Sequence, residues 1–231
     1  MGNGQRDRIL SGISTLDQAL EGGGIRKGSL VLIKGEASSR KDLFGYHFLK
    51  EGLQNGERVV FYDVEASSDE IMDIHDMEEE KGSGELIFVD ACPKYSKFFI
   101  NAVPARIIEH LENLVGVQRV LINPLTFFVE KFGVRDTGDF LIMIRDIAMD
   151  KGMVIVILMA DILSELEMQS VIDKCDGIIE LDTHRGSRGA YHTISIQKFG
   201  KGRGNIHVTY VVREGKVMIS PFRTSESISY D

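Results

Sequence analysis

Short apolar runs alternate with segments of helical periodicity along most of the chain. The apolar runs predict buried strands at residues 30–33, 58–62, 85–90, 119–123, 153–160 and 177–181. Apolar residues at helical spacing, together with capping and turn residues, predict helices at 41–52, 68–77, 100–114, 138–151 and 165–174. Because strands that alternate with helices form parallel sheets covered on both faces, we predict an α/β fold with a mostly parallel central sheet.

The hydrophobic pattern changes after residue 181. Residues 191–198, 207–212 and 216–219 alternate between apolar and polar positions, with glycine-containing turns between them. This period of two predicts an antiparallel extension on one edge of the sheet. We find no internal repeat and no linker. We therefore expect one domain over residues 1–231, with a glycine-rich N-terminal segment at 1–28 and a frayed polar tail at 224–231.

The first predicted strand leads into a modified phosphate-binding loop. The template for such a loop is G-x-x-x-x-G-K-[ST], in which backbone amides and the lysine hold phosphates. Residues 35–42 read GEASSRKD. Gly35 and Lys41 match the template, whereas Arg40 replaces the second glycine and Asp42 replaces the hydroxyl residue. The spacing of the loop is therefore kept, while two of its chemical roles are changed.

A longer stretch around this loop resembles the opening of KaiC-type domains of the RecA superfamily. Residues 11–35 read SGISTLDQALEGGGIRKGSLVLIKG, with the Leu-Asp pair and the glycine cluster of that family. YDVEAS at 62–67 lies where the family has two glutamates, RVLIN at 119–123 where it has the Walker B strand, and CDGIIEL at 175–181 looks like its late strand. The resemblance covers about residues 8–220 and implies a RecA-like P-loop NTPase fold of the single-domain archaeal or bacterial type.

The resemblance also implies which residues would form the site. In a working site, loop amides and the lysine hold the β- and γ-phosphates of ATP, a hydroxyl ligates Mg²⁺, and a glutamate activates water. Asn123 stands at the Walker B aspartate position, and an amide binds a hard dication less well than a carboxylate. Glu65 matches the first glutamate, while Ala66 stands at the second. The nucleotide-binding positions would be Gly35, Ser38, Ser39, Arg40, Lys41 and Asp42.

These departures fall on phosphate approach, metal ligation, the water shell of the metal and the catalytic base. We therefore predict negligible ATP hydrolysis and interpret the chain as a pseudo-ATPase, a regulatory or scaffolding subunit in signalling. Whether ATP or ADP binds is left open, and Asp42 and Asn123 are poor candidates for holding Mg²⁺. One alternative is a slow ATPase in which Asp42 ligates Mg²⁺ directly and Glu65 is the catalytic base, although Glu65 reads equally well as a strand-end carboxylate.

A recombinase-like nucleic-acid binder is the other alternative. The resemblance places loops that face a ring pore or a neighbouring subunit around the late hairpin, whereas the residues alone favour a solvated loop. The formal net charge of −8 opposes a general affinity for nucleic acid. We expect a homo-oligomer, for which a hexamer is one arrangement, or association with a related active KaiC-like subunit. The basic residues of this stretch are Arg185, Arg188, Lys198, Lys201 and Arg203.

The remaining sequence features exclude several other classes. No apolar run reaches the length of about 18 residues that a membrane span needs, and the polar start does not resemble a signal peptide, so we expect a cytoplasmic protein. The cysteines, Cys92 and Cys175, each lie beside an apolar run and are interpreted as buried free thiols. The histidines form no spacing that is typical of a metal site.

Overall fold

The computed structural model describes residues 7–20, 22–65, 82–91, 100–186, 189–199, 206–213 and 216–219. The predicted helix at 68–77, the thiol of Cys92 and the polar tail at 224–231 lie outside the described residues.

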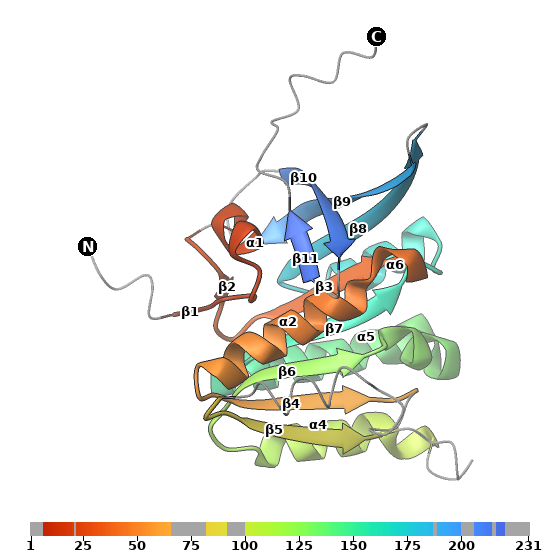
Figure 1. Cartoon of the computed structure of the whole chain (residues 1–231). Helices are drawn as coiled ribbons and strands as arrows, with labels where there is room; N and C mark the ends of the chain where they lie inside the picture. Colours follow the sequence, from red (N-terminus) through yellow and green to blue (C-terminus); the bar gives the residue numbers. More distant parts are fainter. Residues whose placement is uncertain are drawn as a thin grey trace.

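Within the described residues, nine strands form one central sheet (Figure 1). Their order across the sheet is β11-β10-β9-β8-β3-β7-β6-β4-β5. The strands from β8 to β5 are parallel, and β9, β10 and β11 continue the sheet in antiparallel fashion. The predicted fold class and the predicted antiparallel extension are confirmed. The strands are β3 (Leu30–Gly35), β4 (Arg58–Asp63), β5 (Glu85–Asp90), β6 (Val117–Asn123), β7 (Val154–Ala160), β8 (Gly177–Gly186), β9 (Gly189–Phe199), β10 (Ile206–Arg213) and β11 (Lys216–Ile219).

Helices cover both faces of the parallel part of the sheet (Figure 1). Helix α2 lies on one face, and the N-terminal segment lies on the same side, with α1 and the two-stranded sheet of β1 and β2. Helices α4 and α5 lie on the other face. No helix in the described part of the chain is long and apolar enough to cross a membrane. The bounds are β1 (Arg8–Ile9), α1 (Ser14–Ala19), β2 (Ile25–Arg26), α2 (Lys41–Gln54), α4 (Val103–Asn113), α5 (Leu125–Lys151) and α6 (Glu165–Ile172).

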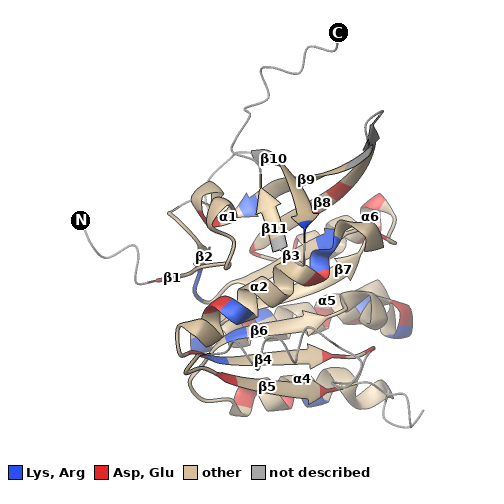
Figure 2. Cartoon of the chain, in the orientation of Figure 1, with Lys and Arg blue, Asp and Glu red and all other residues tan. Residues whose placement is uncertain are grey.

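The interior of the sheet is apolar because both of its faces are buried. Within β3, Leu30 and Leu32 belong to the hydrophobic cluster under α4 and α5, whereas Val31 and Ile33 belong to the cluster under α2. Alternate residues of a strand point to opposite faces, so continuous apolar runs were the correct signal for these strands. Figure 2 shows that charged residues lie mostly on the helices and at the strand ends. Cys175 is a buried free thiol as predicted, and burial raises its pKa to about 12.

One predicted helix is longer than its apolar pattern indicated. The prediction covered 138–151, whereas α5 begins at Leu125 and reaches Lys151. It is two helices that meet at Gly133, whose φ of 79° lies in a region that glycine adopts without strain. Gly133 and Gly138 interrupt the helical pattern, which is why the sequence did not indicate the first half.

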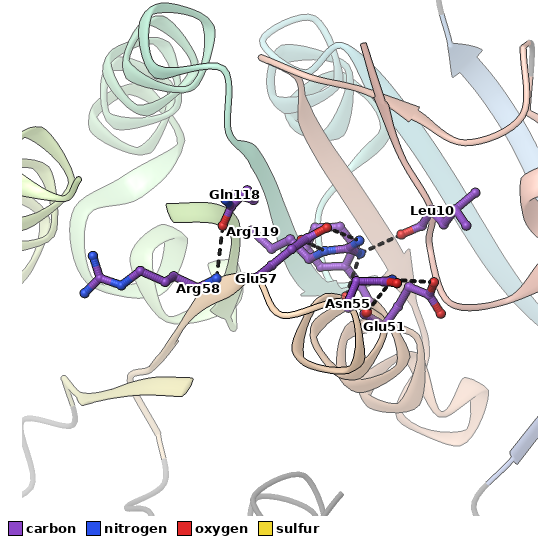
Figure 3. Close-up of polar contacts among 8 residues, drawn as sticks. Leu10, Glu51, Asn55, Glu57, Arg58, Gln118 and Arg119 are labelled. Carbon is purple, nitrogen blue, oxygen red and sulfur yellow. Dashed lines mark hydrogen bonds and ion pairs between the residues drawn. The ribbon is translucent and has the colours of Figure 1, made fainter. Parts of the chain in front are cut away.

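A charged residue inside β6 ties three parts of the fold together (Figure 3). Arg119 is 1% exposed and forms a two-point ion pair with Glu57, with atom distances of 2.5 and 3.2 Å. Its Nη1 also donates to the backbone carbonyls of Leu10 and Phe48, at 2.6 and 2.8 Å. Because Arg119 satisfies its donors in this way, it holds the N-terminal segment, α2 and the start of β4 to the sheet.

Candidate functional site

A tight turn joins β3 to α2 at the positions of the predicted phosphate-binding loop. A 3₁₀ turn, Ala37–Ser39, follows β3, and α2 begins at Lys41. Arg40 lies between them with φ 53° and ψ 42°, a left-handed conformation that glycine adopts more easily. Gly35 has no room for a side chain, because a Cβ atom there would lie 2.6 Å from the Leu181 carbonyl oxygen. The predicted loop positions are therefore brought together in one turn at the carboxyl end of β3.

The side chains of Arg40 and Asp42 bind each other. Arg40 Nε lies 3.2 and 3.1 Å from the two carboxylate oxygens of Asp42, and Arg40 Nη2 lies 2.9 Å from Oδ2. Both side chains are partly exposed, at 45% and 36%. The two residues that replace the glycine and the hydroxyl of the template thus form a single charge pair at the start of α2.

Lys41 keeps the position of the phosphate-binding lysine. Its Nζ lies 3.5 Å from the Glu36 carbonyl oxygen, so the side chain folds back over the loop. Burial lowers the pKa of Lys41, and the nearby carboxylates of Asp42 and Glu65 oppose that shift. The Ser39 hydroxyl donates to the same Glu36 carbonyl at 2.6 Å and is committed to the loop itself.

A buried carboxylate takes part in the contacts at the Walker B position. Asn123 and Asp63 are paired at the ends of the neighbouring strands β6 and β4, and Asn123 Nδ2 donates to Asp63 Oδ2 at 2.8 Å. Asp63 is only 1% exposed, and its other oxygen accepts a hydrogen bond from the Glu65 amide at 2.9 Å. The sequence interpretation missed Asp63, although parallel strands end at the same edge of a sheet and this residue ends the strand next to Asn123.

Glu65 lies close to the loop. Burial raises the pKa of Glu65, the carboxylates of Asp63 and Glu130 raise it further, and Lys41 lowers it. The charges of Glu65 and Lys41 therefore act on each other's pKa. Ala66, at the position of the second glutamate, lies outside the described residues.

A further charged cluster lies beside the loop at the ends of β3 and β8. Lys34 is 6% exposed and forms an ion pair with Glu180, and its Nζ lies 3.9 Å from Asp161. A cavity of about 120 Å³ opens next to this cluster and is also lined by Asp182. Burial, followed by the charge of Glu180, raises the pKa of Asp182. The sequence interpretation did not single out this cluster, because Lys34 appeared as part of a strand end.

The described residues do not fit a magnesium–nucleotide complex of the family type. Asp42 brings a negative charge to the place where phosphates would bind, and its carboxylate is bound by Arg40. Asn123 stands at the position that holds the water shell of the metal, and its amide is bound to Asp63. Among the described residues, no group of three or more His, Cys, Asp or Glu side chains is arranged to hold a metal ion.

The predicted basic stretch is described only in part. Lys198 lies near the end of β9 and donates to the Cys175 backbone carbonyl at 2.6 Å. Arg185 belongs to β8, and its side chain lies outside the described residues, as do Arg188, Lys201 and Arg203.

A parallel sheet with a strand–turn–helix phosphate loop and late antiparallel strands defines the P-loop NTPase class of RecA type. Within this class, the ATPase family KaiC matches residues 9–219, and the chain belongs to this family. The resemblance stated from the sequence is therefore confirmed.

Several known proteins are similar to this chain. The crystal structure of a KaiC-like protein from the hyperthermophilic archaeon Pyrococcus horikoshii OT3 superposes with a TM-score of 0.74 and 19% identity, over 93% of this chain and 99% of that one. The circadian clock protein KaiC3 of a Synechocystis strain is 29% identical over 52% of this chain and 27% of its own length. The circadian clock oscillator protein KaiC of Rippkaea orientalis is 42% identical over 26% of this chain and 11% of its own. The matched segments thus span about a quarter or less of these curated relatives.

Proposed function

We propose that this KaiC family member has lost ATP hydrolysis and acts as a regulatory or scaffolding subunit in signalling. The observation that carries the proposal is the charge pair between Arg40 and Asp42 at the start of α2. In the family template, these two positions hold the glycine that admits the phosphates and the hydroxyl that ligates Mg²⁺. Asn123 places an uncharged amide where the template has the Walker B aspartate, so the negative charge that serves the metal is also missing.

The helix dipole explains why the Asp42 carboxylate opposes a nucleotide. The N-terminus of α2 carries partial positive charge, which favours a phosphate in a working loop. Asp42 is an acidic residue in the first turn of α2, so the chain's own carboxylate benefits from this charge. A bound phosphate would face that carboxylate and would compete with it for Arg40 and for the helix end.

Calorimetric titration with ATP and ADP, with and without Mg²⁺, tests this proposal. We expect the natural chain and Lys41→Ala to give the same titration, because no nucleotide binds at Lys41. The double variant Arg40→Gly/Asp42→Thr is expected to gain Lys41-dependent binding, because both changes restore template residues. Arg135→Ala/Asp136→Ala removes an exposed Arg and an exposed Asp from α5 and is expected to behave like the natural chain. Phosphate release that Lys41→Ala abolishes would overturn the proposal, whereas Lys41-dependent binding with micromolar affinity would show that the loop still holds a nucleotide.

One observation favours a second candidate, a slow ATPase. Arg40 keeps the left-handed turn that the template reaches with glycine, so the backbone of the loop is preserved. In this second candidate, Asp42 ligates Mg²⁺ directly and Arg40 offsets its charge. Magnesium-dependent phosphate release by the natural chain, abolished by Lys41→Ala, distinguishes this candidate from the first.

The proposed subunit role requires association with other chains. We propose that residues 1–231 form one KaiC-like domain that assembles with its own copies or with an active KaiC-like subunit. Light scattering after size-exclusion chromatography, with and without ATP, measures the self-association. A monomer under both conditions would exclude the homo-oligomer and leave the mixed assembly, which co-elution with an active family member tests.

A further inference from the structure

A second cavity lies at the end of the sheet opposite to the loop between β3 and α2. It has a volume of about 410 Å³ and opens beside the amino ends of β3 and β8, where Ser29 and Asp176 lie. Figure 1 shows β1 and β2 on this side of the molecule, where the parallel strands begin. The cavity is thus separated from the loop by the length of β3, and a ligand bound in it would not contact Lys41.

The walls of this cavity are basic, in contrast to the whole chain. Only one carboxylate, that of Asp176, accompanies the cations among the described lining residues. The chain as a whole carries a formal net charge of −8, so this concentration of positive charge runs against its average composition. Clustered cations with low-dielectric walls attract anions. The cationic lining residues are Arg8, Arg26, Lys27, Arg145 and Lys198.

Neutral groups hold several of these cations in place. Arg8, Arg145 and Lys198 each donate a hydrogen bond to a backbone carbonyl, at 2.9, 3.3 and 2.6 Å. A carbonyl positions a cation without cancelling its charge, and each of these side chains has further N–H groups. The carboxylate of Asp176 accepts a hydrogen bond from the Leu30 amide at 3.0 Å, so part of its capacity is used by the sheet.

Ion pairs with described residues neutralise little of the positive charge in this cavity. Arg145 pairs with Asp146 at 3.8 Å, and the two side chains are 34% and 60% exposed, so solvent screens this pair. Arg26 and Lys27 are exposed and form no ion pair with any other described residue. A ligand with two or more negative charges would supply the missing partners.

Two apolar side chains complete the lining. Met149 lines the cavity and is 69% exposed, so its side chain is accessible to a ligand. The ring of Phe199 packs on Gly177, where an added Cβ would lie 2.6 Å from a ring atom. Apolar surface next to guanidinium groups suits a flat apolar group that is joined to phosphates.

We propose that this cavity binds a small phosphorylated ligand that carries a planar apolar group, with the size and chemistry of a nucleotide. The proposal does not depend on the state of the nucleotide loop, because the two sites share no residue. Lys41→Ala separates binding at the loop from binding in the cavity.

The test uses calorimetric titration of the full chain with pyrophosphate and with ADP, both without Mg²⁺. Arg26→Gln/Lys27→Gln removes two exposed charges from the cavity, and Arg145→Gln removes a third. We expect both probes to bind the natural chain and Lys41→Ala equally. Each cavity variant should weaken binding by about tenfold or more, as expected for lost charge-assisted hydrogen bonds. The charge-matched control is Lys131→Gln/Arg135→Gln, two exposed positions on α5, and it should leave the affinity unchanged.

Several results would overturn the proposal. No heat with either probe at millimolar concentration would do so, as would equal weakening in the α5 control, which indicates unspecific attraction. Loss of binding in Lys41→Ala alone would place the ligand at the loop. Binding of an oligoglutamate peptide without binding of pyrophosphate would replace the small ligand by an acidic protein partner. The expected contribution of the planar group is tighter binding of ADP than of pyrophosphate, a difference that Phe199→Leu should reduce.

Discussion

The Tyr210 hydroxyl donates a 2.6 Å hydrogen bond to the backbone carbonyl of Ser39, so the antiparallel strand β10 holds the loop between β3 and α2 in place. The neighbouring strands add a second connection. The hydroxyls of Ser38 and Thr183 lie 3.1 Å apart, and Thr183 lies 3.1 Å from His192 Nδ1. The ring of His192 stacks on Tyr210 with centroids 5.1 Å apart. The conformation of the loop is therefore coupled to β8, β9 and β10.

Tyr210→Phe tests this coupling. The change removes one hydroxyl and leaves the carbonyl of Ser39, a fully buried residue, without this partner, which costs about 1–3 kcal/mol. We expect lower stability and faster hydrogen exchange at the amides of Ser39 and Lys41. Tyr191→Phe is the control, because Tyr191 is 43% exposed and its ring stacks on His184 without touching the loop. Equal exchange rates in the two variants would contradict the coupling.

Arg119 and Arg58 allow a comparison of buried and exposed ion pairs. Arg119→Met leaves Glu57 and two backbone carbonyls without their partner, and we expect a loss of about 3–5 kcal/mol. Arg58→Met removes the pair with Glu85, whose side chains are 41% and 56% exposed, and an exposed hydrogen bond from Arg58 Nη1 to the Val115 carbonyl. We expect the free energy of unfolding to fall by at most about 1–2 kcal/mol. Urea unfolding measures both. A loss in Arg119→Met no larger than that in Arg58→Met would show that the Arg119 contacts do not hold the fold.

Gly52 and Gly138 form a matched pair of helical glycines. Alanine normally stabilises a helix interior by about 0.5–1 kcal/mol relative to glycine. Gly138→Ala should show this gain, because the nearest atom to an added Cβ is the Lys174 Cε at 3.9 Å. At Gly52, an added Cβ would lie 2.6 Å from Arg119 Cδ and Nε, so Gly52→Ala should destabilise the protein. Thermal unfolding should shift in opposite directions, and a gain at both positions would show that Arg119 moves aside freely.

The sequence predicted those features that depend on local pattern. The strand Val154–Ala160 is apolar throughout because it is buried on both faces between β3 and β6, and such a run can be recognised without knowing its neighbours. The turn between β3 and α2 followed in the same way from the spacing of Gly35 and Lys41. Both depend on residues that are close together in the chain.

The missed features depend on contacts between distant residues. Tyr210 and Ser39 are 171 positions apart, and Lys34 and Glu180 are 146 apart. Arg119 looked like one polar residue in an apolar strand, and its burial follows only from the arrangement of α2 and the N-terminal segment around it. No local pattern distinguishes a buried, hydrogen-bonded arginine from an exposed one.

The contact between Asn123 and Asp63 predicts that the Walker B aspartate cannot be restored without cost. Asn123→Asp would replace a hydrogen bond by two carboxylates that face each other, and Asp63 is 1% exposed. Repulsion between like charges raises the pKa of one carboxyl in the variant pair, and each unit corresponds to about 1.4 kcal/mol. The folded variant then binds more protons than the unfolded chain above the ordinary carboxyl range. Its stability should therefore fall as the pH rises through the raised pKa and recover on acidification.

The matched control for this last prediction is Asn55→Asp. Asn55 donates to the carboxylate of Glu51 at 2.9 Å on an exposed helix end, so the same change creates a solvated pair of like charges. We expect the free energy of unfolding of that control to fall by about 0.5 kcal/mol or less, with little dependence on pH. Urea unfolding at several pH values measures both variants. A pH-independent loss of stability in Asn123→Asp would contradict the repulsion. Recovery of its stability on addition of Mg²⁺ at neutral pH would show that the two carboxylates together can bind the cation.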